Sequence, residues 1–258
     1  MKVLILPTPE QAVRRAADIV AEAIFSTPKI TLGLATGGTM VPLYRELRAD
    51  YMAGLSFAGV TSFNLDEYVG LAPDHMASYH YYMRDVLFDH VDIDPANTHL
   101  PRGDAPDPVA EADRYDAAIR DAGGIDLQLL GIGQNGHIGF NEPTSSMTSR
   151  TRIKTLTAST RAANRPYFDT DDQVPRLAIT MGVGTISDAR HCLLLATGDN
   201  KAQAVAQMVE GPLSAACPAS ILQMHRHATV VLDTAAAAGL RLTDYYEHVH
   251  PGGQDPVI

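Results

Sequence analysis

The sequence predicts an α/β protein, and two features of the chain lead to that prediction. Short runs rich in Val, Ile and Leu alternate with segments of helical periodicity, which is typical of parallel strands joined by crossover helices. The chain has 258 residues, 45% of them hydrophobic, and can therefore bury such strands under helices. We expect an open, mostly parallel, Rossmann-like sheet with helices on both faces. No repeat or linker interrupts the pattern, so residues 1–250 should form one domain, with a loose tail at 251–258.

The expected strands are short apolar runs bounded by turn-forming residues. They cover residues 3–6, 30–34, 60–64, 127–132, 177–180, 192–196 and 229–232. In open parallel sheets, ligands bind beyond the carboxyl ends of the strands. We therefore expect the functional residues in the segments that directly follow these runs.

The first helix has the clearest signals in the chain. Thr8 is suited to cap it, Pro9 to open it, and Glu10 places a carboxylate in its first turn. Apolar residues then recur at the 3.6-residue period as far as Ile24. Further helices are expected over residues 41–52, 79–88, 108–121, 201–210 and 235–248.

Composition excludes several classes of function. Twenty basic residues against 30 acidic ones give a net charge of −10, which opposes binding to nucleic acid or an anionic membrane. No run approaches the roughly 18 apolar residues of a membrane-spanning helix. The two cysteines, Cys192 and Cys217, lack the spacing of a metal site. The pair His225 and His227 lacks further ligands nearby. We interpret the cysteines as buried thiols of a reducing compartment and expect a cytoplasmic protein; a phosphorylated small molecule stays compatible with a locally positive pocket.

Thr36, Gly37, Gly38 and Thr39 follow an expected strand and precede an expected helix. The glycines let backbone N–H groups converge and the helix N-terminus favours an anion, so this turn is predicted to cradle a phosphate. The alternative is a tight turn in which Thr39 is an ordinary N-cap.

Lys201 also follows an expected strand, and it lies at the start of an expected helix. The positive end of the helix dipole repels the lysine cation, and an anion bound between them would remove this repulsion. The alternative is a flexible surface lysine.

Asp66 and Glu67 follow the expected strand that ends at residue 64. Because adjacent side chains there point in different directions, one carboxylate can enter a cleft while the other braces the loop. A carboxylate in the cleft could act as a general base on a carbon acid beside a carbonyl or imine. The alternative is a solvated acidic loop.

A glycine-rich run at 131–143 contains a literal G-x-G-x-x-G after an expected strand. A dinucleotide site would need a helix next and an acidic residue about 20 residues further on. The run instead contains helix-opposing glycine and proline, and residues 150–154 are basic, so we reject a nicotinamide cofactor. Histidine ordinarily changes charge near neutral pH, and Asn135 and Glu142 are close enough to orient the ring of His137 for proton transfer. The alternative is a structural histidine.

Together these segments resemble the glucosamine-6-phosphate deaminase family. The resemblance is carried by the Thr-Gly-Gly-Thr turn, by Leu-Asp-Glu-Tyr-Val-Gly from residue 65 and by Gly-His-Ile-Gly-Phe-Asn-Glu-Pro from residue 136, and it extends to about Lys201. It implies conversion of glucosamine 6-phosphate and water into fructose 6-phosphate and ammonia, with no metal or organic cofactor. The rival interpretations are a 6-phosphogluconolactonase-like hydrolase, which lacks the Asp-Glu-Tyr segment, and a non-catalytic sugar-phosphate sensor.

The resemblance also implies roles for individual residues. Asp66 would take a proton from C2 of the sugar and return it to C1. His137, held by Asn135 and Glu142, would move protons during opening of the sugar ring. The glycine turn and Lys201 would clamp the phosphate at the other end of the substrate.

One phosphate ligand departs from the family pattern. The family usually has an arginine just before two aromatic residues that match Tyr167 and Phe168. In this chain that position is Pro166, and Arg165 lies one residue earlier. We predict that Arg165 reaches the phosphate by a shifted backbone.

A second site is implied by allosteric, hexameric members of the family. They bind N-acetylglucosamine 6-phosphate between subunits through residues that match Ser145, Arg152, Lys154 and Tyr245. Arg152 and Lys154 would share one face of a strand and could accept a phosphate. The alternative is a solvated edge strand whose charges discourage aggregation. The resemblance therefore implies an activator site in a homo-oligomer, which would be a hexamer if it is allosteric.

Overall fold

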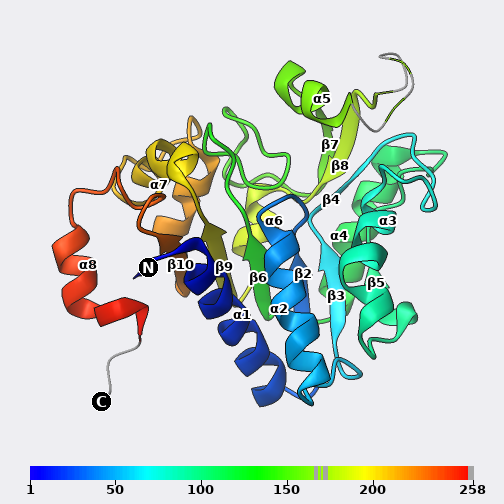
Figure 1. Ribbon diagram of the computed structural model, residues 1–258. Helices are drawn as coiled ribbons and strands as arrows, with labels where there is room; N and C mark the ends of the chain where they lie inside the picture. Colours follow the sequence, from blue (N-terminus) through cyan, green and yellow to red (C-terminus); the bar gives the residue numbers. More distant parts are fainter. Residues whose placement is uncertain (166–167, 169, 171–173, 255–258) are drawn as a thin grey trace.

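The computed structural model describes residues 1–165, 168, 170 and 174–254 of the chain. In this part of the chain, seven parallel strands form one sheet in the order β1-β10-β9-β6-β2-β3-β5 (Figure 1). The strands are β1 (Lys2–Leu6), β2 (Thr31–Leu34), β3 (Thr61–Asn64), β5 (Thr98–His99), β6 (Leu127–Leu130), β9 (His191–Ala196) and β10 (Ala228–Asp233). The predicted α/β class with a mostly parallel sheet is confirmed.

Helices surround this sheet, and α1 and α2 pack against each other across the face seen at the front of Figure 1. The start of α1 is as predicted: the Thr8 side chain accepts a hydrogen bond from the Gln11 N–H, and the apolar stripe is buried. The helices are α1 (Pro9–Ser26), α2 (Met40–Met52), α3 (Tyr79–Val86), α4 (Pro108–Asp121), α5 (Ala158–Asn164), α6 (Val183–Ser187), α7 (Ala202–Val209) and α8 (Thr243–Val249). Short 3₁₀ helices cover Phe88–His90, Pro95–Asn97, Asp199–Lys201, Pro218–Gln223 and Pro251–Gly253.

A second, smaller sheet lies above the carboxyl ends of β2, β3 and β6 (Figure 1). It is antiparallel, with the order β4-β8-β7, where β4 is Asp66–Tyr68, β8 is Leu177–Thr180 and β7 is Arg152–Thr155. The expectation that residues 177–180 belong to the parallel sheet is therefore wrong. The apolar run correctly predicts a strand, but its partners are two polar strands whose pairing is determined by contacts distant in sequence.

The C-terminal segment also differs from expectation. The predicted helix over 235–248 is helical only in α8, because residues 234–239 form turns and residues 240–242 are irregular. Gly239 comes so close to α7 that a Cβ there would lie 2.7 Å from the Ala202 carbonyl oxygen, so small residues serve close packing here. The tail expected to be loose is packed at its start, where Gly253 is buried and accepts a hydrogen bond from Arg15 Nε at 3.1 Å.

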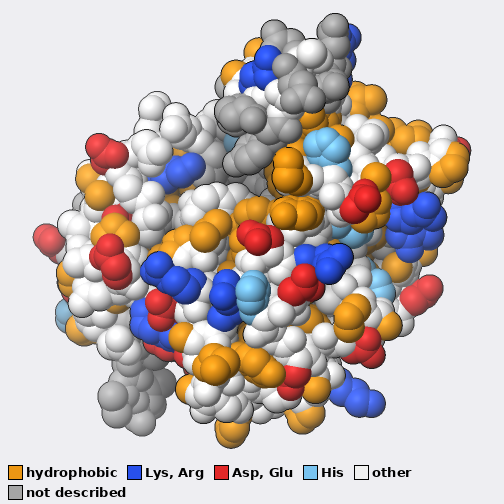
Figure 2. Space-filling model, turned by 45° about the vertical axis from the view of Figure 1, so that its right-hand side comes forward, with side chains coloured by type: hydrophobic (Ala, Val, Ile, Leu, Met, Phe, Trp, Pro, Cys, Tyr) orange, Lys and Arg blue, Asp and Glu red, His pale blue; other side chains and the backbone are white. Residues whose placement is uncertain are grey.

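Figure 2 shows that acidic and basic side chains are interspersed over one face of the molecule. Within the described residues, no helix is both long enough and apolar enough to cross a bilayer. The two cysteines, Cys192 and Cys217, are buried free thiols.

Candidate active site

A cleft of about 700 Å³ opens between the small sheet and the carboxyl ends of the parallel strands. Its walls come from the segments that follow β2, β3, β6 and β9, so it lies where an open parallel sheet is expected to bind ligands. Nine of the predicted phosphate-binding and catalytic residues line it: Thr36, Gly37, Gly38, Thr39, Asp66, Asn135, His137, Glu142 and Lys201.

The turn after β2 presents its backbone to this cleft. Gly37 has φ +108°, a conformation that glycine adopts readily, and the space beside Gly37 and Gly38 is open. Tyr82 Oη donates a hydrogen bond to the Gly37 carbonyl at 2.9 Å and fixes the turn. The Thr39 side chain makes no capping bond to α2, so the alternative of an ordinary N-cap is not what the structure shows. The arrangement suits an anion at the start of α2.

Lys201 reaches the same cleft from the segment after β9. Its Nζ donates to the Ile132 carbonyl at 2.7 Å, and burial lowers the pKa of this amine. Arg165 is not among the residues that line the cleft; its guanidinium donates to the Phe168 carbonyl at 2.5 Å. Pro166 and Tyr167 lie outside the described residues.

Asp66 and Glu67 point in opposite directions from β4, because successive side chains of a strand alternate between its faces. The Asp66 carboxylate lies in the cleft wall, and the nearby Phe140 N–H and Thr180 hydroxyl lower its pKa. Burial, and secondly the negative charge of Glu67, raise the pKa of Asp66 to about 8. A carboxylate with a pKa near the working pH is suited to general acid–base catalysis.

Glu67 braces the loop, as expected of one of the two acids. It is fully buried and accepts hydrogen bonds from the backbone N–H groups of Tyr68, Tyr79 and His80 at 2.8 to 3.0 Å. The His80 ring Nδ1 lies 2.8 Å from Glu67 Oε2. Since both acids are buried, the alternative of a solvated acidic loop is wrong.

His137, Asn135 and Glu142 form a hydrogen-bonded chain. Asn135 Nδ2 donates to Glu142 Oε2 at 2.7 Å, so Asn135 Oδ1 faces His137 Nδ1, also at 2.7 Å. The amide oxygen only accepts, which assigns the proton to Nδ1 and leaves Nε2 as the basic atom of a neutral ring. The neighbouring His137, Asn135 and Lys154 lower the pKa of Glu142 despite its burial. The dyad of amide and carboxylate thus orients the ring.

Two residues at this site escaped the sequence argument. Tyr79, at the start of α3, lines the cleft; its hydroxyl lies 3.0 Å from that of Tyr68, and its ring stacks on Phe140 with centroids 6.1 Å apart. Thr180 is paired with Asp66 across β8 and β4, and its hydroxyl lowers the pKa of that acid. A serine before a run of aromatic residues indicates the helix start, but no local signal indicates that the helix faces the cleft.

The predicted activator residues occupy two separate regions. Arg152 Nη1 donates to Asn141 Oδ1 at 2.8 Å, and Lys154 is close enough to Glu142 to lower its pKa. Ser145 is buried with its hydroxyl unpaired. Tyr245 is exposed on α8, which packs beside β1 on the opposite side of the molecule from β7 (Figure 1). One chain therefore does not bring Tyr245 to the other three.

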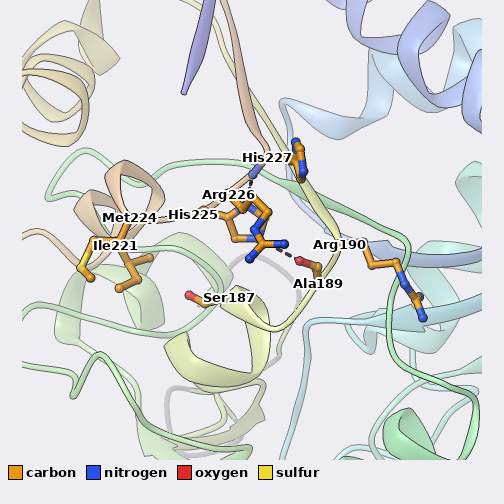
Figure 3. A pocket seen from close by; sticks show the side chains of 8 residues that line it. All are labelled: Ser187, Ala189, Arg190, Ile221, Met224, His225, Arg226 and His227. Carbon is orange, nitrogen blue, oxygen red and sulfur yellow. Dashed lines mark hydrogen bonds between the residues drawn. The ribbon is translucent and has the colours of Figure 1, made fainter.

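A hollow of about 470 Å³ lies at the end of the sheet opposite the cleft, near the starts of β9 and β10 (Figure 3). It contains His225, Arg226 and His227, and the His225 ring Nε2 contacts the Ala189 carbonyl at 2.8 Å, as the dashed line marks. Among the described residues, no group of three or more His, Cys, Asp or Glu side chains could hold a metal ion. The hollow lies at the amino ends of these strands, whereas the proton-transfer groups line the cleft at the carboxyl ends.

Comparisons with known proteins show the family to which the chain belongs. The family model described as glucosamine-6-phosphate isomerases/6-phosphogluconolactonase matches residues 8–231. The glucosamine-6-phosphate deaminase of Shewanella woodyi is 52% identical over 255 residues, which cover 98% of this chain and 97% of the relative. That of Corynebacterium aurimucosum is 56% identical over 247 residues, which cover 95% of this chain and 96% of the relative.

Solved structures extend the likeness to three dimensions. A monomeric glucosamine-6-phosphate deaminase has a TM-score of 0.89 and 46% identity, covering 93% of this chain and 100% of that one. A 6-phosphogluconolactonase from Trypanosoma cruzi has a TM-score of 0.76 and 20% identity, covering 93% and 97%, which shows a shared fold alone. The chain therefore belongs to the family of glucosamine-6-phosphate isomerases and 6-phosphogluconolactonases, and its near relatives in that family are glucosamine-6-phosphate deaminases.

Proposed function

We propose that the protein is an enzyme that converts glucosamine 6-phosphate and water into fructose 6-phosphate and ammonia. The observation that carries the proposal is Asp66: a buried carboxylate with a pKa raised to about 8 in the wall of a cleft that also contains His137. Lactone hydrolysis has no use for abstraction of a carbon-bound proton, so this carboxylate favours the amino-sugar reaction over the lactonase alternative. A carbon acid next to an imine or aldehyde does require such a base.

The cleft gives the substrate a direction. Its phosphate would bind at the backbone N–H groups of residues 37–39 and at Lys201, and the sugar would extend toward Asp66 and His137. Interactions with the non-reacting phosphate then orient C1 and C2 at the acid–base groups.

Ring opening is the first chemical step. His137 Nε2 takes the proton of the C1 hydroxyl and returns a proton to the ring oxygen, so the C1–O5 bond breaks and the C1 aldehyde forms. The Nδ1–H bond to Asn135, with Glu142 behind it, stabilises the transiently charged imidazole.

Isomerisation follows at C1 and C2. Ionised Asp66 takes the C2 proton while a water molecule gives a proton to the C1 oxygen, and an enolamine results. Asp66 then returns its proton to C1, which leaves an iminium ion at C2. The hydroxide left from the water adds to that carbon, the carbon–nitrogen bond breaks as the new hydroxyl proton moves to nitrogen, and fructose 6-phosphate and ammonia leave. Asp66 thus carries the proton from C2 to C1, and the proposed steps use neither metal nor organic cofactor.

The test is purified protein with glucosamine 6-phosphate, with ammonia and fructose 6-phosphate measured together. Equal amounts of both products support the proposal. Hydrolysis of 6-phosphogluconolactone without ammonia release would instead support the lactonase alternative, and binding of the amino-sugar phosphate without turnover would support a sensor.

Lys201→Met is expected to weaken binding of the phosphate more than it slows the chemistry. Loss of a charge-assisted hydrogen bond should raise KM for glucosamine 6-phosphate by roughly 10- to 100-fold, with a smaller change in kcat. Steady-state kinetics measure both constants. Lys29→Met removes an exposed lysine away from the cleft and should leave both unchanged. An unchanged KM in Lys201→Met would contradict the assignment, and the same assay on Arg165→Ala tests whether Arg165 also reaches the phosphate.

We further propose a regulatory anion site at Ser145, Arg152 and Lys154. Its support is the buried, unpaired Ser145 hydroxyl close in sequence to the segment that Arg152 and Lys154 contact. Tyr245 could join only from a second copy, so this proposal includes a homo-oligomer, a hexamer if activation is allosteric. The solved relative is described as monomeric.

N-acetylglucosamine 6-phosphate is therefore expected to lower the half-saturating substrate concentration, and Tyr245→Ala to abolish that response without changing the basal rate. Velocity curves with and without the acetylated sugar, combined with light-scattering mass, measure both properties. Hyperbolic curves that do not change on addition of the acetylated sugar, from a monomeric protein, would refute the site.

We also propose a cytoplasmic location, which is supported by the free thiols of Cys192 and Cys217.

A further inference from the structure

Thr180 occupies the central position of one row across the small sheet. In the register of β4 and β8, Asp66 is paired with Thr180, and on the other side Thr180 is paired with Arg152 of β7. Side chains directly opposite each other in an antiparallel pair lie on the same face and are in contact range. Thr180 is fully buried, so its hydroxyl must find its partners inside the protein.

The Thr180 hydroxyl lies where the small sheet meets the histidine loop. Its oxygen accepts the Phe140 N–H at 3.2 Å, and the hydroxyl is near enough to the Asp66 carboxylate to lower the pKa of that acid. The hydroxyl donates to the Met181 carbonyl at 3.3 Å, but an ionised carboxylate is the stronger acceptor for its single proton. A Cβ on Gly139 would lie 3.2 Å from both Asp66 Oδ2 and Thr180 Oγ1, which shows how closely this loop covers the pair.

We propose that Thr180 is a positioning residue, which turns its hydroxyl proton to Asp66 when that carboxylate ionises and so favours the charged form and aims it into the cleft. The inference rests on the proposed function, because a positioned base has a purpose only if Asp66 takes a proton from substrate. It adds a residue that touches the base without lining the cleft itself.

The surroundings of Asp66 explain why one hydroxyl should matter. Glu67, its neighbour in β4, opposes its ionisation, while Tyr79 on α3 and Tyr115 on α4 are affected by its charge. Arg152 is directed to Asn141. The groups that lower the pKa of Asp66 are the Phe140 N–H and the Thr180 hydroxyl, which are neutral hydrogen-bond donors and not cations. His137 faces the same cleft and is held by Asn135.

Thr180→Val keeps the shape of the side chain and removes the hydroxyl, while Thr180→Ser keeps the hydroxyl. The ascending limb of kcat/KM against pH should have its midpoint near 8 in the unaltered protein. In Thr180→Val the midpoint should rise by about one pH unit or more, because a hydrogen bond to the charged form is lost. At pH 7 kcat should fall roughly tenfold while KM changes little, and Thr180→Ser should restore the profile of the unaltered protein.

A measurement without substrate separates this inference from the proposed function. The carboxyl carbon of Asp66, labelled with ¹³C and assigned by its disappearance in Asp66→Asn, should titrate at higher pH in Thr180→Val than in the unaltered protein or Thr180→Ser. This shift supports the role of Thr180 in holding the charge even if no ammonia is formed. A folded Thr180→Val protein, verified by circular dichroism, with an unchanged Asp66 titration and an unchanged activity profile would overturn the proposal.

Discussion

Asp66→Asn is expected to reduce ammonia release from glucosamine 6-phosphate by about a thousandfold or more. The amide cannot accept the C2 proton, and loss of a positioned general base typically costs about 10²- to 10⁴-fold in rate. Binding of the phosphate should survive, because the turn at 37–39 and Lys201 lie at other parts of the cleft wall. The kinetic result should therefore be a large loss in kcat with a small change in KM.

Asp121→Asn is a suitable control, since it changes an exposed acid at the end of α4 in the same way. It should keep full activity. If Asp66→Asn kept more than about a tenth of the rate, another group would be the base. An equal fall in both variants would point to a general effect on the protein instead of the loss of one base.

Asp66→Asn is expected to lower activity but to raise the stability of the folded protein at higher pH. The pKa of Asp66 is raised on folding, so between about pH 4 and pH 8 the folded protein holds a proton that the unfolded chain has lost. The free energy of unfolding must then fall as pH rises through this interval. Asp66→Asn should remove this contribution, and chemical denaturation at several pH values should show the variant gaining stability relative to the unaltered protein as pH rises.

Glu67→Ala is expected to be the most destabilising single change near the site, at about 3 to 5 kcal/mol of unfolding free energy. Glu67 is fully buried, and its removal leaves the N–H groups of Tyr68, Tyr79 and His80 without their acceptor. Each buried donor that is left unpaired costs about 1 to 3 kcal/mol, and three donors lose their acceptor here.

Urea denaturation followed by circular dichroism measures this loss. Glu22→Ala is the matched control, because Glu22 is exposed on α1 and should change stability by no more than about 0.5 kcal/mol. A Glu67→Ala protein as stable as the control would show that the loop around β4 does not depend on this acid. The two adjacent acids thus have separable roles, one for chemistry and one for structure.

Much of the fold and of the reacting groups is predictable from local sequence. Apolar runs predict the parallel strands, and the glycine turn at 36–39 is placed after β2 because its neighbours have clear strand and helix patterns. The opposite orientations of Asp66 and Glu67 follow from alternation along a strand, whatever the strand pairs with. These predictions depend on nearest neighbours in the chain, which is why they agree with the structure.

The small sheet was not predictable in this way. Its outer strands, β4 and β7, are polar and short, and β8 alone has an apolar run that does not indicate its partners. The contact of Thr180 with Asp66 depends on that pairing, as does the closure of the histidine loop over both. Tyr79 likewise enters the site through the packing of α3, and such contacts between distant segments leave no local pattern.

The most direct test of the account is the fate of hydrogen at C1 when the reaction runs in D₂O. If Asp66 carries a proton from C2 to C1, part of the fructose 6-phosphate should contain a single deuterium at C1, on one face only, as detected by NMR. Asp66→Asn should give no measurable incorporation. Product from the unaltered protein with no deuterium at C1, or incorporation by Asp66→Asn at the unaltered rate, would contradict proton transfer by this carboxylate.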